Sequence, residues 1–352
     1  MKAVFRFAQE KGGIEIRDMP IPEIGDGDVL IKVRAAGLCG SDMNSYLGRS
    51  TLYTPVIMGH EFSGEIAEVG SRVENWKVGD RVCSDNTGYV CGTCPACIKG
   101  EYLQCPSRKG LGSRLNGGFA EYIRVQEHVL KTHPTCLMRL PDKISFEEGA
   151  ILDPPANGYN AAVQQGGLMP GESVAVFGAG PLSLGSITVA NAAGAVDIIC
   201  IVRKSTNKLH RDAALKLGAT KILEAEDENI VKTVKDMTNG EGVSMVLDGA
   251  GPNSLIELGV DITRYGGKIL RIGYDWNPVN YSLNNMVNRN ISLIGHMGFN
   301  PVSWRNVIRL MNADKIDVKT MITHVLPLTD FFKGVEAMLS REAIKVIYKP
   351  EW

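Results

Sequence analysis

Four cysteines stand close together in one short polar stretch and have the spacing of metal ligands. Cys91, Cys94, Cys97 and Cys105 follow the pattern C-x2-C-x2-C-x7-C, with glycine and proline between them to favour tight turns. Thiolates spaced in this way can wrap a single zinc ion tetrahedrally. Two disulfides are one alternative, although adjacent C-x2-C pairs bridge poorly, and an iron–sulfur cluster is another. Because all four candidate ligands are cysteines, with no histidine or carboxylate among them to leave an open coordination position, we predict a structural zinc site.

A second group of metal-binding residue types lies earlier in the chain, in glycine-rich turns. The segments 37–42 and 59–65 contain Cys39, His60 and several carboxylates. Zinc accepts this mixture of sulfur, nitrogen and oxygen, and three protein ligands with one open position are typical of a catalytic site. Taken separately, each segment is equally compatible with a core cysteine and a surface histidine.

Length and charge limit the class of protein and its partners. The chain has 352 residues, which is too long for one ordinary core and predicts two domains. A net charge of -1, from 38 basic and 39 acidic residues, creates no broad field to attract nucleic acid or a membrane. We therefore expect a small-molecule partner. The amino terminus has no apolar signal core, and the eight cysteines suit a reducing compartment, so we expect a cytoplasmic protein.

The pattern of hydrophobic residues changes between the two halves of the chain. Up to about residue 150, short β-rich runs alternate with turn signals, which predicts an antiparallel, barrel-like domain. From about residue 171, strands and helices alternate, which predicts a doubly wound parallel sheet. The last segment ends in a strand that we expect to close back on the first domain. The predicted division is 1–153, completed by 298–352, and 154–297.

A glycine-rich turn follows the apolar strand predicted at residues 173–177. In Gly178-Ala179-Gly180-Pro181-Leu182-Ser183, Gly178 permits a tight turn, and Gly180 lets the backbone approach a pyrophosphate at the start of a helix. Pro181 suits the first helical position. Ser183 replaces the usual third glycine, so we expect a small shift of the helix with phosphate binding retained. The alternative is an ordinary glycine turn. The residues predicted to bind the dinucleotide here are Gly178, Gly180, Pro181 and Leu182.

The end of the next strand bears on which dinucleotide is used. Asp197 follows the glycine-rich turn by about the number of residues expected for an acidic residue that binds the ribose hydroxyl of NAD. However, Asp197 begins this strand and so lies at the end opposite the cofactor. At the other end stand Arg203 and Lys204, and arginine can pair with phosphate oxygens through two hydrogen bonds. We therefore predict NADP, with NAD as the alternative if these residues are only a solvated basic loop.

The motifs together resemble one known family over essentially the whole chain. They are G-H-E-x-x-G-E at 59–65, V-G-D-R-V at 78–82, the four-cysteine stretch, G-G-F-A-E-Y at 117–122 and G-A-G-P-L at 178–182. The chain resembles the zinc-dependent medium-chain alcohol dehydrogenases. Residues 37–42, 60–66 and 112–114 resemble the polyol and sugar-alcohol dehydrogenases, of the sorbitol and galactitol-phosphate type. The resemblance implies an α/β protein with a GroES-like β-barrel catalytic domain and a Rossmann domain.

The resemblance also implies roles for individual residues. Cys39, His60 and Asp153 match the ligands of a catalytic zinc, and Glu61 matches a neighbouring carboxylate that binds the metal directly or exchanges with water or substrate. Further matches give Ser41 the proton transfer, Asp42 the orientation of the ligand histidine, and Lys345 a contact with the cofactor phosphates; a surface lysine is the alternative for Lys345. Asn44 stands where the family commonly has a histidine of the proton path.

The expected activity is reversible oxidation of a secondary alcohol, on a polyol or sugar-like substrate, to a ketone with hydride transfer to NADP. Zinc would act as Lewis acid and template. One rival is an NADPH-dependent quinone or enone reductase that needs no catalytic zinc. Another is a zinc-stabilised nucleotide-binding protein without catalysis. Family members are usually dimers or tetramers, so the resemblance implies a homo-oligomer.

Overall fold

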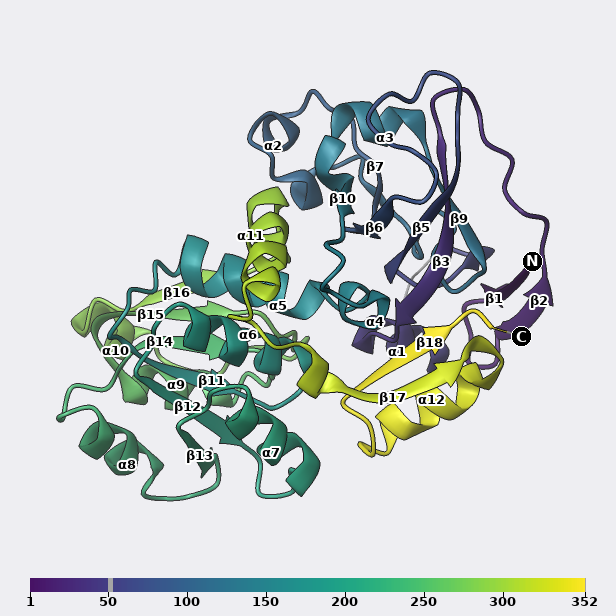
Figure 1. The fold of residues 1–352 in the computed structure, drawn as a ribbon. Helices are drawn as coiled ribbons and strands as arrows, with labels where there is room; N and C mark the ends of the chain where they lie inside the picture. The colour runs from purple at the N-terminus through teal and green to yellow at the C-terminus, as the bar shows by residue number, and fades with distance from the viewer. Residues whose placement is uncertain (50–52, 352) are drawn as a thin grey trace. The chain divides into compact units, whose positions relative to one another are not determined.

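A computed structural model describes residues 1–49 and 53–351 of the chain and divides it into two compact units (Figure 1). The first unit, the barrel unit, comprises Met1–Leu152, Asn300–Ile308 and Ile322–Trp352. The second, the cofactor unit, comprises Asp153–Phe299 and Arg309–Met321. Within the described residues, none of the helices combines the length and the apolar character needed to span a membrane.

The barrel unit is built mostly from antiparallel strands, as the alternating β-rich runs predict, and only β17 and β18 of its described strands pair in parallel. Its main sheet has seven strands in the order β10-β6-β5-β3-β18-β17, with β9 also paired to β3. These strands are β3 (Val29–Gly37), β5 (Glu61–Val69), β6 (Arg81–Ser84), β9 (Tyr122–Val125), β10 (Leu137–Arg139), β17 (Ile322–Pro327) and β18 (Lys345–Lys349). The smaller sheets contain β1 (Lys2–Arg6), β2 (Ile14–Asp18) and β4 (Val56–Ile57), and β7 (Thr87–Tyr89) with β8 (Lys109–Gly110).

Short helices connect and cover these strands. They are α1 (Gly40–Tyr46), α2 (Pro95–Ile98), α3 (Glu127–Thr132), α4 (Phe146–Gly149) and α12 (Phe331–Leu339), with the 3-10 turns η1 (Tyr102–Gln104), η2 (Pro134–Cys136) and η5 (Leu328–Asp330). The core of the unit joins both ends of the chain, because Phe62 and Phe119 pack in one cluster with Phe331 and Tyr348. The carboxyl-terminal segment therefore packs into the core of the first unit.

The last strand lies beside the strand that leads into the first metal-binding segment. In Figure 1 the yellow β18 runs next to the purple β3, and Ile347 is paired with Gly37. On its other side β3 pairs with β5, so that Gly37 also faces Glu61. Residues near 37, 61 and 345 are thereby brought together by sheet pairing, although they are far apart in the sequence.

The cofactor unit contains a parallel sheet of six strands in the order β13-β12-β11-β14-β15-β16. The strands are β11 (Ser173–Phe177), β12 (Asp197–Val202), β13 (Lys221–Glu224), β14 (Val243–Asp248), β15 (Thr263–Arg271) and β16 (Ser292–Gly295). Numbered from β11, this order is 3-2-1-4-5-6, which is the order of a dinucleotide-binding sheet. Every residue of β14 is buried, as expected for a strand covered on both faces. The predicted doubly wound sheet is confirmed.

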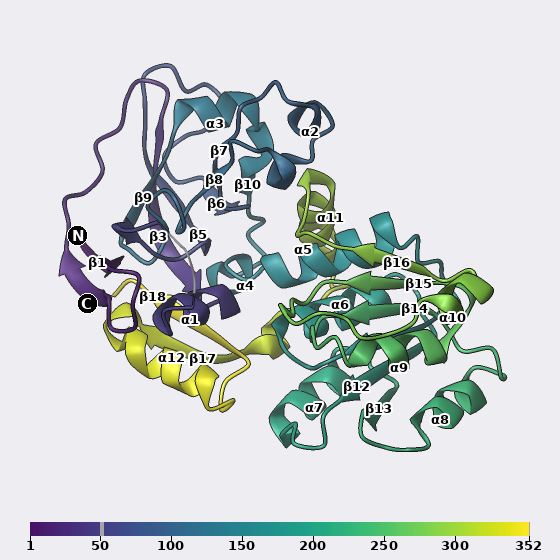
Figure 2. The same cartoon turned by 180° about the vertical axis from the view of Figure 1, so that it is seen from behind.

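Helices pack on both faces of this sheet (Figure 2). They are α5 (Asp153–Tyr159), which continues as the π-helix η3 (Asn160–Gln165), α6 (Pro181–Ala192), α7 (Lys208–Lys216), α8 (Ile230–Met237), α9 (Leu255–Ile262) and α10 (Asn284–Asn288). Residues of α8 and α9, such as Val234 and Val260, form one core cluster with Phe177 and Ile201 of the sheet. Gly185 of α6 lies so close to α5 that a Cβ there would come within 2.5 Å of the carbonyl carbon of Pro154.

The division between the units differs from the predicted one at helix α11 (Pro301–Asn312) and the turn η4 (Lys319–Met321) that follows it. The sequence placed all of 298–352 in the first domain, whereas residues 309–321 group with the cofactor unit. A hydrogen bond from the backbone N–H of Asp317 to the hydroxyl of Thr188 on α6, at 3.3 Å, helps to hold this segment there. Hydrophobic periodicity does not reveal such a contact, because the two residues are far apart in the chain.

Candidate metal and cofactor sites

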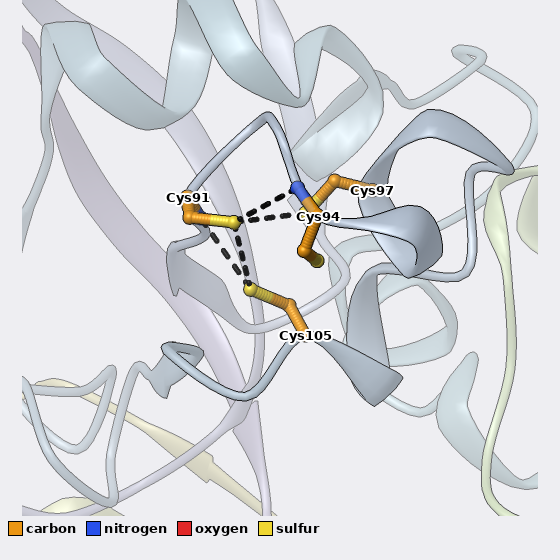
Figure 3. A group of neighbouring side chains, drawn as sticks. All are labelled: Cys91, Cys94, Cys97 and Cys105. Carbon is orange, nitrogen blue, oxygen red and sulfur yellow. Dashed lines mark hydrogen bonds between the residues drawn. The ribbon is translucent and has the colours of Figure 1, made fainter.

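The four cysteines predicted to bind zinc converge in one loop of the barrel unit (Figure 3). The sulfur atoms of Cys91, Cys94, Cys97 and Cys105 all lie within 4.8 Å of one another. Helix α2 begins directly after Cys94, with Pro95 at its first position, and turns Cys97 toward the other thiols. Backbone N–H groups support the cluster as well, since the N–H of Cys94 lies 3.3 Å from the sulfur of Cys91.

The environment of these thiols fits a cation at their centre. Hydrogen bonds from the backbone N–H groups of Thr93 and Cys94 lower the pKa of Cys91 to about 6. Burial raises the pKa of Cys97 to about 12, and only 6% of this residue is exposed. A bound divalent cation supplies the positive charge that holds such thiols in the thiolate form. The all-sulfur donor set suits zinc in a closed, structural site.

A second group brings together Cys39, His60 and Glu61, whose ligand atoms also lie within 4.8 Å of one another. Cys39 stands between the end of β3 and the start of α1, and Glu61 is the first residue of β5. The pairing of β3 with β5 places the two segments side by side. The sulfur, nitrogen and oxygen donors of this group match the mixture that catalytic zinc sites use.

Asp42 supports two members of this second group at once. One carboxylate oxygen accepts a hydrogen bond from the backbone N–H of Cys39 at 3.0 Å, as part of the cap of α1. The other oxygen lies 3.6 Å from Nδ1 of His60. The side chain of Asp42 is 1% exposed. A buried carboxylate in this position orients the imidazole ring and increases its strength as a ligand.

Glu61 is held by a lysine from the last strand of the chain. The ammonium nitrogen of Lys345 lies 2.7 Å from Oε1 and 2.6 Å from Oε2 of Glu61, and both side chains are 1% exposed. The carboxylate fits here because Gly37 has no side chain: a Cβ at Gly37 would come within 2.6 Å of Oε2 of Glu61. Two buried charges are tolerable only as a pair.

This ion pair changes the prediction for Lys345. The family match placed Lys345 at the cofactor phosphates, whereas the structure buries its ammonium group against Glu61. The sequence does contain a signal for such a partner, since Lys345 stands in the buried strand β18, where an unpaired charge would be costly. Its partner, 284 residues away, could not be read from the sequence.

The electrostatics of the second group also favour a cation. Burial by itself would lower the pKa of His60, but the charges of Asp42 and Cys39, and hydrogen bonds with them, outweigh burial and raise the pKa well above its usual value. A neutral ligand histidine therefore requires another positive charge nearby. A metal ion bound by Cys39 and His60 would meet that requirement.

The remaining predicted catalytic residues lie on two helices. Ser41 is an exposed residue of α1, two positions after Cys39, and Asn44 is also exposed on this helix. Asp153 begins α5 in the cofactor unit, where one of its carboxylate oxygens accepts a hydrogen bond from the amide of Asn157 at 2.7 Å. Asp153 and the Cys39 group belong to different units, so the family resemblance remains the support for Asp153 as a ligand.

The predicted phosphate-binding turn has the conformation that its glycines suggest. Gly178, directly after β11, has φ +90, which is the left-handed region that glycine tolerates. Gly180 caps α6, and Pro181 and Leu182 are its first residues. The helix thus begins at the carboxyl end of the first strand of the sheet, where its N-terminal N–H groups can bind an anion.

Ser183 fits without the glycine that the common motif has at this position. Its hydroxyl donates to the carbonyl of Phe177 at 2.9 Å and is buried. Gly249 leaves room for it, because a Cβ at Gly249 would lie 2.5 Å from the Ser183 oxygen. A second glycine, outside the motif, therefore makes space for the serine hydroxyl between strand and helix.

Two exposed cations, from which the sequence predicts NADP, follow the end of β12. Arg203 and Lys204 follow the last residue of the strand, Val202, and both are exposed. Asp197 lies at the other end of β12, where its carboxylate accepts a hydrogen bond from the hydroxyl of Ser173 at 2.7 Å. Because ligands of parallel sheets bind at the carboxyl ends of the strands, Arg203 and Lys204, and not Asp197, are at the edge where a dinucleotide binds.

Comparison with known proteins identifies the family. Residues 25–135 match the alcohol dehydrogenase GroES-like domain, and residues 181–313 match the zinc-binding dehydrogenase family. The zinc-type alcohol dehydrogenase-like protein YdjL of Escherichia coli (strain K12) is 39% identical over 351 residues, which cover 99% of this chain and 98% of that protein. The D-arabitol-phosphate dehydrogenase of Enterococcus avium is 34% identical over 349 residues, covering 99% and 97%.

Solved structures agree with this assignment. The galactitol-1-phosphate dehydrogenase of Escherichia coli has a TM-score of 0.88 and 28% sequence identity, with 99% of this chain and 100% of that chain covered. The first unit therefore has the GroES-like fold that the sequence predicts. The chain belongs to the zinc-dependent medium-chain alcohol dehydrogenases and has relatives of the polyol dehydrogenase type.

Proposed function

We propose that this protein oxidises a secondary alcohol of a polyol, or of a polyol phosphate, to the ketone and reduces NADP in the same reversible reaction. The observation that carries the proposal is the group formed by Cys39, His60 and Glu61, whose mixed donor atoms lie within 4.8 Å of one another. Such a donor set leaves room for a substrate oxygen, whereas the four-cysteine cluster is already complete.

Different residues of the chain would bind the metal, orient the ligand histidine and transfer the proton of the alcohol. Cys39 and His60, with Asp153 or Glu61, would hold a zinc ion, which supplies a Lewis acid and a template for the substrate oxygen. Asp42 keeps His60 oriented. Ser41 takes or relays the proton of the alcohol hydroxyl; Asn44 cannot titrate, so the proton leaves without a histidine at that position.

The buried pair of Glu61 and Lys345 sets the charge beside this donor group. While Lys345 neutralises Glu61, the metal site carries one negative charge less than it would with Glu61 unpaired. A less negative site favours release of a proton from the substrate hydroxyl, because the resulting anion meets less repulsion. We propose that Lys345 acts on the reaction in this indirect way, by holding Glu61.

The relatives suggest the class of substrate. Two of the similar proteins are named for arabitol phosphate and galactitol 1-phosphate, and another relative is a sorbitol dehydrogenase. All three names describe linear polyols with secondary hydroxyl groups. We therefore propose pentitols and hexitols, free or with a terminal phosphate, as the substrates to test.

Binding of NADPH and NADH, followed by fluorescence of the zinc-loaded protein, tests the proposed cofactor. We expect tighter binding of NADPH, and we expect Arg203→Gln with Lys204→Gln to weaken NADPH binding more than NADH binding. Lys208→Gln is a matched control, because Lys208 is an exposed cation on α7 paired with Asp212. Equal binding of both nucleotides by the unmodified protein would show that the basic residues only face solvent.

Turnover of a panel of polyols and their phosphates tests the proposed reaction. We expect ketone formation coupled to nucleotide reduction. We expect this reaction to stop when the zinc proposed at Cys39 and His60 is removed. Turnover of enones or quinones that survives removal of this zinc would instead favour the reductase. Binding of nucleotide without turnover of any alcohol would favour the non-catalytic alternative.

A further inference from the structure

The loop that contains Arg114 is fixed against the segment that leads into His60. The backbone N–H of Ile57 donates to the side-chain oxygen of Asn116 at 3.0 Å. The backbone N–H of Gly117 donates to the carbonyl of Ile57 at 2.8 Å, and that of Gly118 to the carbonyl of Gly59 at 2.7 Å. These bonds tie the residues after Arg114 to the strand end directly before the metal-binding histidine.

The residues before Arg114 approach His60 itself. Gly112 has φ +73, and a Cβ there would come within 2.6 Å of the Gly59 carbonyl and 2.9 Å of the backbone nitrogen of His60. Arg114 is two residues further along, so its Cα lies within about 8 Å of the Cα of Gly112. From that position, the long arginine side chain can reach a group at the far end of a short polyol chain.

Arg114 differs in its side-chain contacts from six other arginines of the barrel unit. Those six pair with carboxylates and are Arg17, Arg34, Arg72, Arg81, Arg124 and Arg139. Within residues 1–49 and 53–351, the side chain of Arg114 instead lies over the ring of Tyr53, with 5.6 Å between Cζ and the ring centroid. Tyr53 is 61% exposed. A guanidinium over an aromatic ring, without a carboxylate partner, keeps N–H groups available for a two-point contact.

We propose that Arg114, positioned by Tyr53, binds the terminal phosphate of a polyol phosphate and thereby makes the phosphorylated polyol the preferred substrate. The inference rests on the proposed function, because it concerns the same substrate site. A free polyol has no charge for this cation to recognise. A phosphate monoester carries close to two negative charges and accepts paired N–H donors from arginine.

Kinetics with matched substrates test this role. The zinc-loaded protein is assayed with arabitol and arabitol phosphate, and with galactitol and galactitol 1-phosphate, at constant ionic strength. We expect a higher kcat/KM for the phosphate esters. In Arg114→Met we expect the ratio of phosphate ester to free polyol to fall about 10- to 100-fold, mainly through KM, because a charge-assisted contact far from the reacting carbon is lost.

Further variants separate this role from a general effect on folding. Arg114→Lys keeps the charge without the two-point geometry and should retain part of the preference, while Tyr53→Leu should lose less than Arg114→Met. Arg17→Met is the matched control, since Arg17 also lies over an aromatic ring, that of Phe5 at 4.4 Å, but is paired with Glu15. Zinc content and thermal midpoint are measured for every variant.

Three results would overturn the inference: no preference for phosphate esters in the unmodified protein, an equal effect of Arg114→Met on both substrates of a pair, or the same loss in Arg17→Met. If no polyol is oxidised at all, the proposed function fails separately. Calorimetry with the phosphate esters then tests Arg114 directly. Weaker binding to Arg114→Met supports the inference, and unchanged or absent binding in both proteins contradicts it.

Discussion

The two metal-binding groups of the barrel unit differ in how the chain assembles them. The four-cysteine cluster takes all its ligands from residues 91–105, in a single loop. The Cys39 group draws on β3, α1 and β5, and its carboxylate is held by Lys345 from β18. The first site can therefore form from one local segment, whereas the second requires β3 to pair with both β5 and β18. A ligand set spread over the fold can combine different donors and keep a position open for substrate.

If the four-cysteine cluster is structural, its loss should affect order more than chemistry. Cys97→Ser removes a buried thiol, and we expect it to lower the zinc content from two ions per chain to one. Proteolysis should then become rapid between residues 91 and 105, because structural zinc contributes on the order of 10 kcal/mol to the folding of small zinc domains. Cys83→Ser, at a buried thiol outside the cluster, should keep both ions. Resistance of Cys97→Ser to proteolysis would contradict the assignment.

The Cys39 group should show the opposite behaviour. We expect Cys39→Ser to reduce turnover by about 1,000-fold or more, because a catalytic metal contributes several kcal/mol to the transition state. The thermal midpoint should change little, and the four-cysteine zinc should remain. Full activity in this variant would remove Cys39 from the site, and loss of both zinc ions would show that the two sites are not independent.

The contribution of the Lys345–Glu61 pair to stability can be separated from that of other charges on strand β18. Lys345→Met leaves the charge of Glu61 buried without its partner, and we expect a loss of about 3–5 kcal/mol of unfolding free energy in denaturant titrations. Lys349→Met is the matched control on the same strand. Its partner Glu147 is partly exposed, so we expect a loss of less than about 1 kcal/mol.

Adding Glu61→Gln to Lys345→Met tests the cause of that loss. The double variant should regain part of the stability, because the unpaired buried charge is gone. Equal effects of Lys345→Met and Lys349→Met would show that the buried pair has no special importance.

A smaller effect is expected at Asp42, which touches the ligands without being one. In Asp42→Asn the hydrogen bond to the Cys39 backbone can be kept, while the charge beside His60 is lost. We expect the affinity for the second zinc, or the turnover, to fall about 10- to 100-fold. Competition with a chelator measures the affinity. The four-cysteine zinc should be unaffected, and equal weakening of both ions would point to a general loss of stability.

The difference between a site built from one local segment and a site built from distant segments also explains what the sequence could predict. The cysteine spacing and the turn at Gly178 are local patterns, so the cluster and the phosphate-binding turn could be recognised before the fold was known. The sheet order of the cofactor unit followed from the alternation of strands and helices. Lys345 was recognised only through family resemblance and was assigned a different contact, because its pairing with Glu61 depends on β18 lying beside β3.

The sequence also did not reveal which glycines make room for a larger side chain elsewhere in the fold. The sequence shows that Ser183 departs from the glycine motif, but it does not show that Gly249 provides the space for its side chain. Likewise, nothing local to Gly37 shows that its missing side chain makes room for Glu61. Both compensations come from steric contacts between separate elements, which hydrophobic periodicity does not encode.

Anomalous diffraction at the zinc edge, from crystals of the zinc-loaded protein, would show directly whether the Cys39 group binds a second zinc ion. We expect two peaks per chain: one enclosed by the sulfurs of the four-cysteine cluster, and one bound by Cys39 and His60 with a carboxylate as a further ligand. The identity of that carboxylate would decide between Asp153 and Glu61. A single peak at the four-cysteine cluster would contradict the proposal that this protein has a catalytic zinc.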